Sequence, residues 1–234
     1  MTLRQTINKI RAILYDKIIN FKIVRISVII GFSLYIPLLV IAVIIAFLFG
    51  PESFNIWLHN ISDLGSIRYS PAPYLYDLAG VIAGIFTIPF SYYMEKILAP
   101  MPEKKEAFTT VTRLRFRLDS YAFLFSIIGN VGYIMVGIFS EDRNYFGLHF
   151  ISSVLAFAGF VLGAFFMGWL IVLYNTKIPK IIGLYGILGP FTMGIVYLVV
   201  LVNFFQLEPF FEWLLLFAIL GWLIPLIITL FLKK

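Results

Sequence analysis

Apolar residues form six long runs along the chain, separated by short polar segments. The runs cover approximately residues 26–49, 75–98, 121–140, 150–173, 181–204 and 210–232. About 20 apolar residues suffice for a helix to cross a hydrocarbon core of about 30 Å, and a helix satisfies its backbone polar groups internally. The pattern predicts an all-α polytopic membrane protein, a compact bundle of six transmembrane helices within residues 26–232.

The first 25 residues have a different pattern. Apolar residues recur at steps of three or four, with Arg4, Lys9, Arg11 and Lys17 between them, and the apolar positions are Leu3, Ile7, Ile10, Leu14, Ile18 and Phe21. This spacing is typical of a helix with one apolar and one basic face. We therefore predict an amphipathic interfacial helix over residues 1–25.

Basic residues are distributed unevenly between the two sides of the predicted bundle. Sixteen of the 18 Lys and Arg residues lie in the N-terminal segment, in the connections after the second and fourth spans, or at the C-terminal end, and only Arg68 and Arg143 lie on the opposite side. Cytoplasmic loops are enriched in Lys and Arg. The distribution predicts a multi-pass protein of the cell membrane with both termini in the cytoplasm.

Composition supports a membrane protein and excludes several site classes. Hydrophobic residues make up 61% of the 234 residues, charged residues only 13%, and the mean hydropathy is +0.97. With no cysteine, disulfides, thiolate metal sites and cysteine nucleophiles are excluded. The net charge of +6 does not indicate nucleic-acid binding, because the basic residues flank apolar runs without forming a recognition motif.

Small and polar residues within the runs predict how helices pack. Gly80 and Gly84 form a G-x-x-x-G pattern, as do Gly159 and Gly163. Such patterns allow close helix contact, either within one chain or in a homodimer. Asn130 is polar at mid-membrane depth, where it is expected to hydrogen-bond a neighbouring helix or to line a substrate path.

Acids and both histidines gather on the predicted outer side. His59 and Asp63 are four residues apart, so a short interfacial helix would place them on one face. Imidazoles and carboxylates are ligands for Zn²⁺ or another divalent cation, and the candidate ligands are His59, Asp63, Asp77, Asp142 and His149. The alternative is that these residues only order and solvate the loops.

Arg113, Arg115 and Arg117 alternate with apolar residues in the predicted cytoplasmic loop between the second and third spans. Basic residues next to a membrane attract anionic headgroups, so these three are candidate lipid-binding residues. They could equally act only as determinants of orientation.

Two short motifs resemble a known family. The segments are ISDLG at residues 61–65 and GNVGYIMVGIFSED at residues 129–142, followed by His149. They resemble the prokaryotic membrane family catalogued as domain of unknown function 998, which is similar in style to the Frag/DRAM/Sfk membrane proteins. The resemblance implies a six-helix architecture and no reaction, and it covers roughly residues 26–232. The residues at the family's motif positions are Ser62, Asp63, Gly65, Gly137, Asp142 and His149, whereas Ser140 and Asp77 stand where the family often has Pro and Asn.

Three functions are compatible with this sequence. The leading hypothesis is a membrane protein that binds or organises lipid. The second is a metal-dependent interfacial lipid hydrolase or transferase, in which Asp63, Asp142 and His149 are the candidate catalytic residues and a metal-bound water attacks the lipid. The third is a small transporter, which the nearly uncharged midplane of the spans disfavours.

Overall fold

A computed structural model describes residues 3–100 and 110–232, and every regular element within these ranges is helical. The seven α-helices are α1 (Leu3–Ile18), α2 (Phe21–Phe49), α3 (Tyr74–Leu98), α4 (Thr110–Ile138), α5 (Leu148–Leu173), α6 (Lys180–Asn203) and α7 (Glu208–Ile227). Helices α2 to α7 supply six segments long and apolar enough to cross a membrane. The predicted all-α bundle of six spans is confirmed, and the chain is a multi-pass membrane protein.

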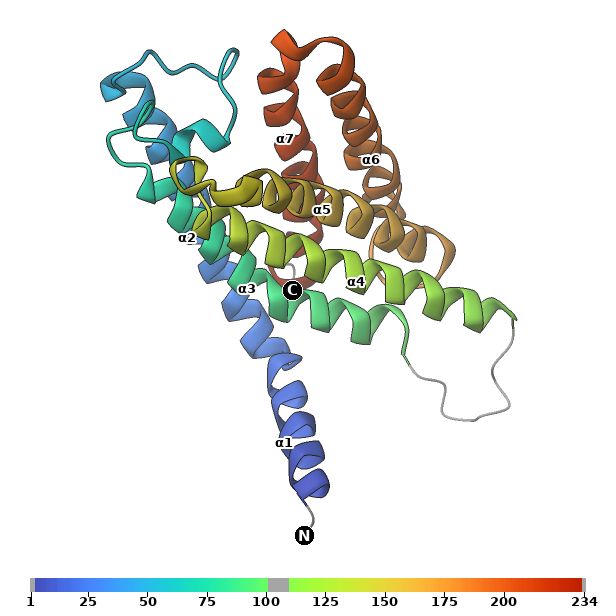
Figure 1. Ribbon diagram of the computed structural model, residues 1–234. Helices are drawn as coiled ribbons and strands as arrows, with labels where there is room; N and C mark the ends of the chain where they lie inside the picture. The colour runs from blue at the N-terminus through green and yellow to red at the C-terminus, as the bar shows by residue number, and fades with distance from the viewer. Residues whose placement is uncertain (1–2, 101–109, 233–234) are drawn as a thin grey trace.

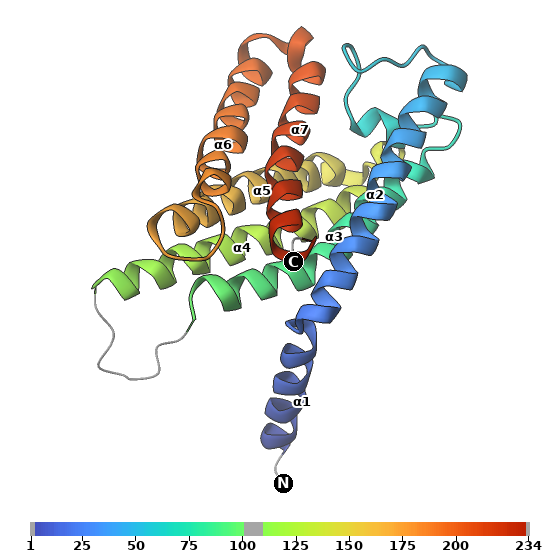
Figure 2. The ribbon, with the colours of Figure 1, turned by 180° about the vertical axis from the view of Figure 1, so that it is seen from behind.

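The helices are arranged as a layer with two groups packed on it. Helices α3, α4 and α5 run side by side, α2 packs against α3, and the hairpin of α6 and α7 packs against α5 (Figures 1 and 2). The segments 50–73, 139–147 and 204–207 lie together at one end of the bundle, which we call the loop end. Helix α1 and the segment 174–179 lie toward the opposite, terminal end.

The apolar core has one main cluster toward each end of the bundle. The cluster at the terminal end includes Val24, Met94, Leu170, Trp222 and Leu226. The cluster at the loop end includes Tyr35, Phe54, Leu64, Tyr76 and Trp213. The loop segment 50–73 therefore contributes buried side chains and is packed as part of the fold.

The N-terminal helix is shorter than the predicted amphipathic segment. The chain leaves helical geometry at Asn20, whose side chain accepts a hydrogen bond from Lys22 N at 3.0 Å and so caps α2. Helix α2 consequently begins at Phe21, five residues before the predicted span. Helix α1 extends away from the bundle (Figure 1), and near its end the Tyr15 hydroxyl donates to Glu95 Oε2 at 3.4 Å.

Helix α4 begins at Thr110, eleven residues before the predicted third span at 121. Hydropathy along the sequence identifies only the part of a helix that is apolar enough for lipid, so it does not detect a polar extension of the same helix. Arg113, Arg115 and Arg117 therefore lie on the first turns of α4 and not in a loop. Of the basic loop, residues 101–109 lie outside the described part of the chain.

Glycines bring the three layered helices into close contact. A Cβ atom on Gly84 would lie 2.6 Å from Asn130 O on α4, and one on Gly159 would lie 2.3 Å from Gly129 N. Only glycine fits such spacings. Both predicted G-x-x-x-G faces thus pack within one chain, which is the first of the two alternatives left open by the sequence.

The predicted hydrogen bond of Asn130 to a neighbouring helix is confirmed. Asn130 is 1% exposed, its Oδ1 accepts from Thr87 Oγ1 at 2.7 Å, and its Nδ2 donates to Ser91 Oγ at 3.0 Å. Both partners lie on α3. Both polar atoms of the Asn130 side chain therefore join α3 to α4, and Asn130 does not line either of the two cavities described below.

Candidate functional site

The loop end gathers the acids and histidines, but it engages them in separate local interactions. His59 lies in a turn, where its ring packs between Phe54 and Tyr69 with centroid distances of 5.4 and 4.7 Å. Its Nδ1 lies 3.1 Å from both the N and the O of Asn55. His59 is thereby a packed side chain that orders the loop.

Asp63 lies in a different element, the short 3-10 helix Ser62–Gly65. The predicted interfacial helix carrying both His59 and Asp63 is wrong, because the chain makes two separate turns here. Asp63 Oδ2 accepts a hydrogen bond from Asn60 N at 2.8 Å. Burial raises the pKa of the Asp63 carboxyl above its ordinary value, and this hydrogen bond partly offsets the effect.

Asp142 joins the two longer segments of the loop end. Its Oδ1 accepts from Ser66 Oγ at 2.8 Å and its Oδ2 accepts from Ile67 N at 2.7 Å. Both carboxylate oxygens are therefore used in fixing the segment 50–73 against the segment 139–147. This arrangement gives Asp142 a structural role.

Asp77 is paired, as a carboxylate inside a span must be. Its Oδ2 lies 2.7 Å from Arg143 Nη2, and Arg143 also donates to the carbonyls of Gly137 and Ile138 at the end of α4. A guanidinium satisfies the free carbonyls of a helix C-terminus and a nearby carboxylate together. Arg143, one of two basic residues on the predicted outer side, thus ties α3 to α4.

His149 and Asp77 are the predicted ligands that have a buried polar atom without a hydrogen-bond partner, Nε2 in His149 and Oδ1 in Asp77, among the described residues. His149 opens α5, is 4% exposed, and has Nδ1 within 2.6 Å of Phe139 O. Because a carbonyl only accepts, Nδ1 carries the proton, which leaves Nε2 as an acceptor in the neutral ring. Nε2 is buried without a hydrogen-bond partner and lies 3.4 Å from Glu141 Oε2.

These contacts do not assemble the predicted metal centre. Across residues 3–100 and 110–232, no group of three or more His, Asp or Glu side chains is arranged to hold a metal ion. The candidate catalytic residues Asp63, Asp142 and His149 each face a different partner. The geometry therefore gives no support to a Zn²⁺-dependent hydrolase.

The three candidate lipid-binding arginines differ from one another. Arg115 Nε donates to Leu98 O at 2.5 Å, and its guanidinium lies 5.1 Å from the centre of the Tyr174 ring. The Arg115 side chain therefore caps the C-terminal end of α3. Arg113 and Arg117 are exposed, so they alone present charge to their surroundings.

A lateral cleft opens between the first half of α5, the second half of α6 and the first half of α7, with a volume of about 500 Å³. Its long apolar part is lined by residues that include Phe157, Val161, Phe191, Ile195, Leu198 and Leu201. Ile195 and Leu198 are 49% and 60% exposed on apolar surface of the bundle. The cleft is therefore open toward the region that lipid occupies around a transmembrane bundle.

One end of the cleft is polar, and it lies at the loop end. The polar side chains there include Asn60, Ser62, Glu141, His149, Glu208 and Glu212. Glu208 and Glu212 are each 5% exposed. Glu208 Oε1 accepts from the Tyr197 hydroxyl at 2.5 Å, and Glu212 Oε2 accepts from Ile61 N at 3.1 Å.

Glu208 and Glu212 are among the acids on the predicted outer side, but they are not among the site residues that the sequence predicts. A signal was present, because two acids four residues apart at the start of an apolar helix share one face. Two acids at a helix N-terminus are equally typical of solvent-exposed residues that interact favourably with the helix dipole. Only the packing of α5 and α6 against α7 shows that both are buried.

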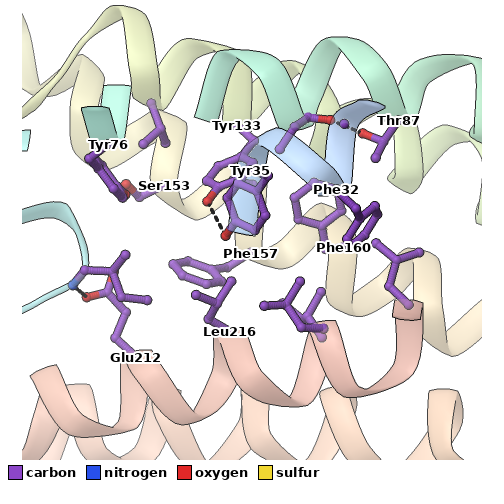
Figure 3. Close-up of a pocket in the computed structure, with 18 residues that line it drawn as sticks. Phe32, Tyr35, Tyr76, Thr87, Tyr133, Ser153, Phe157, Phe160, Glu212 and Leu216 are labelled. Atoms are coloured by element: carbon purple, nitrogen blue, oxygen red, sulfur yellow. Dashed lines mark hydrogen bonds between the residues drawn. The ribbon is translucent and has the colours of Figure 1, made fainter. Parts of the chain in front are cut away.

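A second cavity of about 60 Å³ lies behind the cleft, in the interior between α2, α7 and the three-helix layer. Figure 3 shows the hydroxyls of Tyr35 and Tyr133 meeting across it, 2.8 Å apart, and Glu212 at one end. Ser153, Phe157 and Glu212 line both spaces and so form the wall between them.

Comparison with known proteins adds no relative. No protein-family model matches the chain, and neither a curated protein nor a solved structure matches it. The resemblance to the domain of unknown function 998 family stays a prediction from the sequence.

Proposed function

We propose that this protein binds a single amphiphilic molecule from the bilayer, with the apolar tail in the lateral cleft and the polar head at the loop end. The shape and lining of the cleft carry this proposal. Its volume of about 500 Å³ falls within the range of about 300–1,000 Å³ found for small-molecule sites. Its long apolar part and short polar end match the two parts of an amphiphile.

Two features of the cleft favour a bilayer ligand over one from water. The entrance lies among exposed apolar side chains such as Val154 and Leu198, which a water-soluble ligand would have to cross. The polar groups sit at one end, at the level where the helices give way to loops. A tail lying beside α5 and α6 would then run in the same sense as the surrounding lipid chains.

Blocking the cleft tests the proposal. Ala158 is exposed on α5 and lines the cleft, so Ala158→Trp fills it without disturbing the buried core. Leu124→Trp on α4 is the matched control, because Leu124 is 50% exposed and lies outside the cleft lining.

We expect Ala158→Trp to reduce the amphiphile that remains bound after extensive detergent washing by at least about tenfold, the loss that follows from about 1.4 kcal/mol of binding energy. Mass spectrometry of the extracted lipid measures this. Equal retention by Ala158→Trp, Leu124→Trp and the wild type would contradict the proposal.

A further inference from the structure

The polar end of the cleft has a strong excess of acid. Glu141, Glu208 and Glu212 lie there, and no Lys or Arg lines the cleft within the described ranges. The nearest basic residue along the chain, Arg143, is already bound to Asp77 and to backbone carbonyls. The imidazole of His149 lies beside Glu141, with Nε2 3.4 Å from Oε2, whereas Glu208 and Glu212 form no ion pair among the described residues, so a ligand head here meets an excess of acidic groups.

Two buried acceptors at the same end have no hydrogen-bond partner. His149 lines the cleft, and in its neutral form Nε2 is an acceptor, because Nδ1 donates to Phe139 O. Asn60 Oδ1 is the second. Leaving a buried acceptor unpaired costs about 1–3 kcal/mol, so a ligand that supplies N–H or O–H groups here gains by satisfying them.

The two buried carboxylates add a need for positive charge. Glu208 and Glu212 lie one turn apart on α7, and the donors they receive, the Tyr197 hydroxyl and Ile61 N, are both neutral. A buried carboxyl group must either bind a proton or be compensated by a cation, and a bound cation would stabilise its charged form. The described residues form no group that would hold a metal ion, so an organic cation is the better match.

We propose, resting on the amphiphile-binding function above, that the head of the bound molecule is a protonated primary amine, so that the ligand is a long-chain amine taken from the bilayer. The ammonium supplies both the positive charge and three N–H donors, which suit the carboxylates, His149 Nε2 and Asn60 Oδ1. A phosphate beside the nitrogen would place a negative charge near the three carboxylates. The site therefore favours an amine lipid without a phosphate.

The test compares ligands that differ only in the head. Protein in nanodiscs of phosphatidylcholine, a lipid with no primary amine, is titrated with tritiated hexadecylamine in a scintillation proximity assay, and empty nanodiscs give the background. Hexadecanol, hexadecanoate and hexadecyltrimethylammonium serve as competitors of equal chain length. We expect hexadecylamine to bind at least about tenfold more tightly than each of them, as charge-assisted hydrogen bonds imply.

Carboxamide variants locate the head. Glu208→Gln and Glu212→Gln each keep an oxygen acceptor for Tyr197 or Ile61, and the double variant should lose at least about tenfold in affinity for hexadecylamine while its affinity for hexadecanol stays within about twofold. Glu52→Gln, at an exposed acid outside the cleft, should change neither. Unchanged hexadecanol binding also shows that the double variant is folded.

The outcomes separate this inference from the function on which it rests. Equal affinity for the amine and the alcohol, with both lost in Ala158→Trp, would overturn the amine head and leave amphiphile binding standing. Tighter binding of hexadecanoate than of hexadecylamine would also overturn the amine head and leave amphiphile binding standing. If Ala158→Trp left the binding of every probe unchanged, both the amine head and the binding of an amphiphile in the cleft would be overturned.

Discussion

Individual polar residues at the loop end mostly hold the fold together. Asp142 fixes Ser66 and Ile67, and Asp77 pairs with Arg143. His149 and Glu208 differ from them because they line the cleft. Acids and histidines at the loop end thus either stabilise the fold or line the cleft, and the contacts of each side chain distinguish the two roles.

A substitution at Asp142 tests this distinction. Because Asp142→Ala removes two hydrogen bonds and leaves the buried Ser66 hydroxyl without its acceptor, we expect it to lower the free energy of unfolding by about 1–3 kcal/mol. Reversible unfolding in mixed micelles measures the change. Glu52→Ala, which breaks an exposed ion pair with Arg68, should stay within about 0.5 kcal/mol of the wild type.

Stability unaffected by Asp142→Ala would contradict the structural role of this carboxylate. Asp142 would then be a candidate for a catalytic or binding role. Loss of ligand binding in a variant that is otherwise as stable as the wild type would point the same way.

At the scale of helices, the three-helix layer is closely packed beside the cleft. Helices α3, α4 and α5 meet through glycines along their lengths, which makes the layer a firm support. Helices α5 and α6 also approach closely toward the terminal end, where a Cβ on Gly168 would lie 2.6 Å from Gly183 O. The cleft lies between the portions of α5, α6 and α7 nearer the loop end.

The packing of α3 on α4 can be tested at Gly84. A Cβ in Gly84→Ala would lie 2.5 Å from Ile134 Cγ1 and 2.6 Å from the backbone oxygen of Asn130, so the helices must separate. We expect a loss of about 1–3 kcal/mol in the free energy of unfolding, as for other overpacked cores.

The neighbouring substitution Ile85→Ala is the control, because Ile85 is 48% exposed on the same helix. It should have a much smaller effect in the same mixed-micelle measurement. If Gly84→Ala were as stable as Ile85→Ala, the close contact between α3 and α4 would be refuted.

At the scale of the whole molecule, the arrangement of the ends agrees with the even number of spans. The segments 50–73, 139–147 and 204–207 share one end, and α1 lies toward the other. The distribution of Lys and Arg predicts that the terminal end faces the cytoplasm. The polar end of the cleft would then lie at the outer surface of the membrane.

Orientation is readily measured because the chain has no cysteine. Ser53 at the loop end and Asn175 at the terminal end are exposed, so each can carry a single cysteine. We expect a membrane-impermeant maleimide to label Ser53→Cys in intact cells, and Asn175→Cys only after permeabilisation. The reverse pattern would overturn the predicted orientation and place the polar end of the cleft inside.

The sequence by itself determined the six spans, their order and their helical class, because crossing lipid demands long apolar runs whose backbone groups are satisfied within each helix. It also identified Asn130, since a polar side chain in an apolar span needs a partner on another helix. These properties are local, or depend only on the surrounding solvent.

Tertiary structure decided which polar residues face one another. The sequence grouped His59, Asp63, Asp77, Asp142 and His149 because they share one end of the bundle, yet each has its own partner. Of these five His149 alone lines the cleft, together with Glu208 and Glu212. A cleft is the space left when helices distant in the chain pack at particular angles. Its lining therefore follows from packing between α5, α6 and α7, which hydropathy along the chain does not encode.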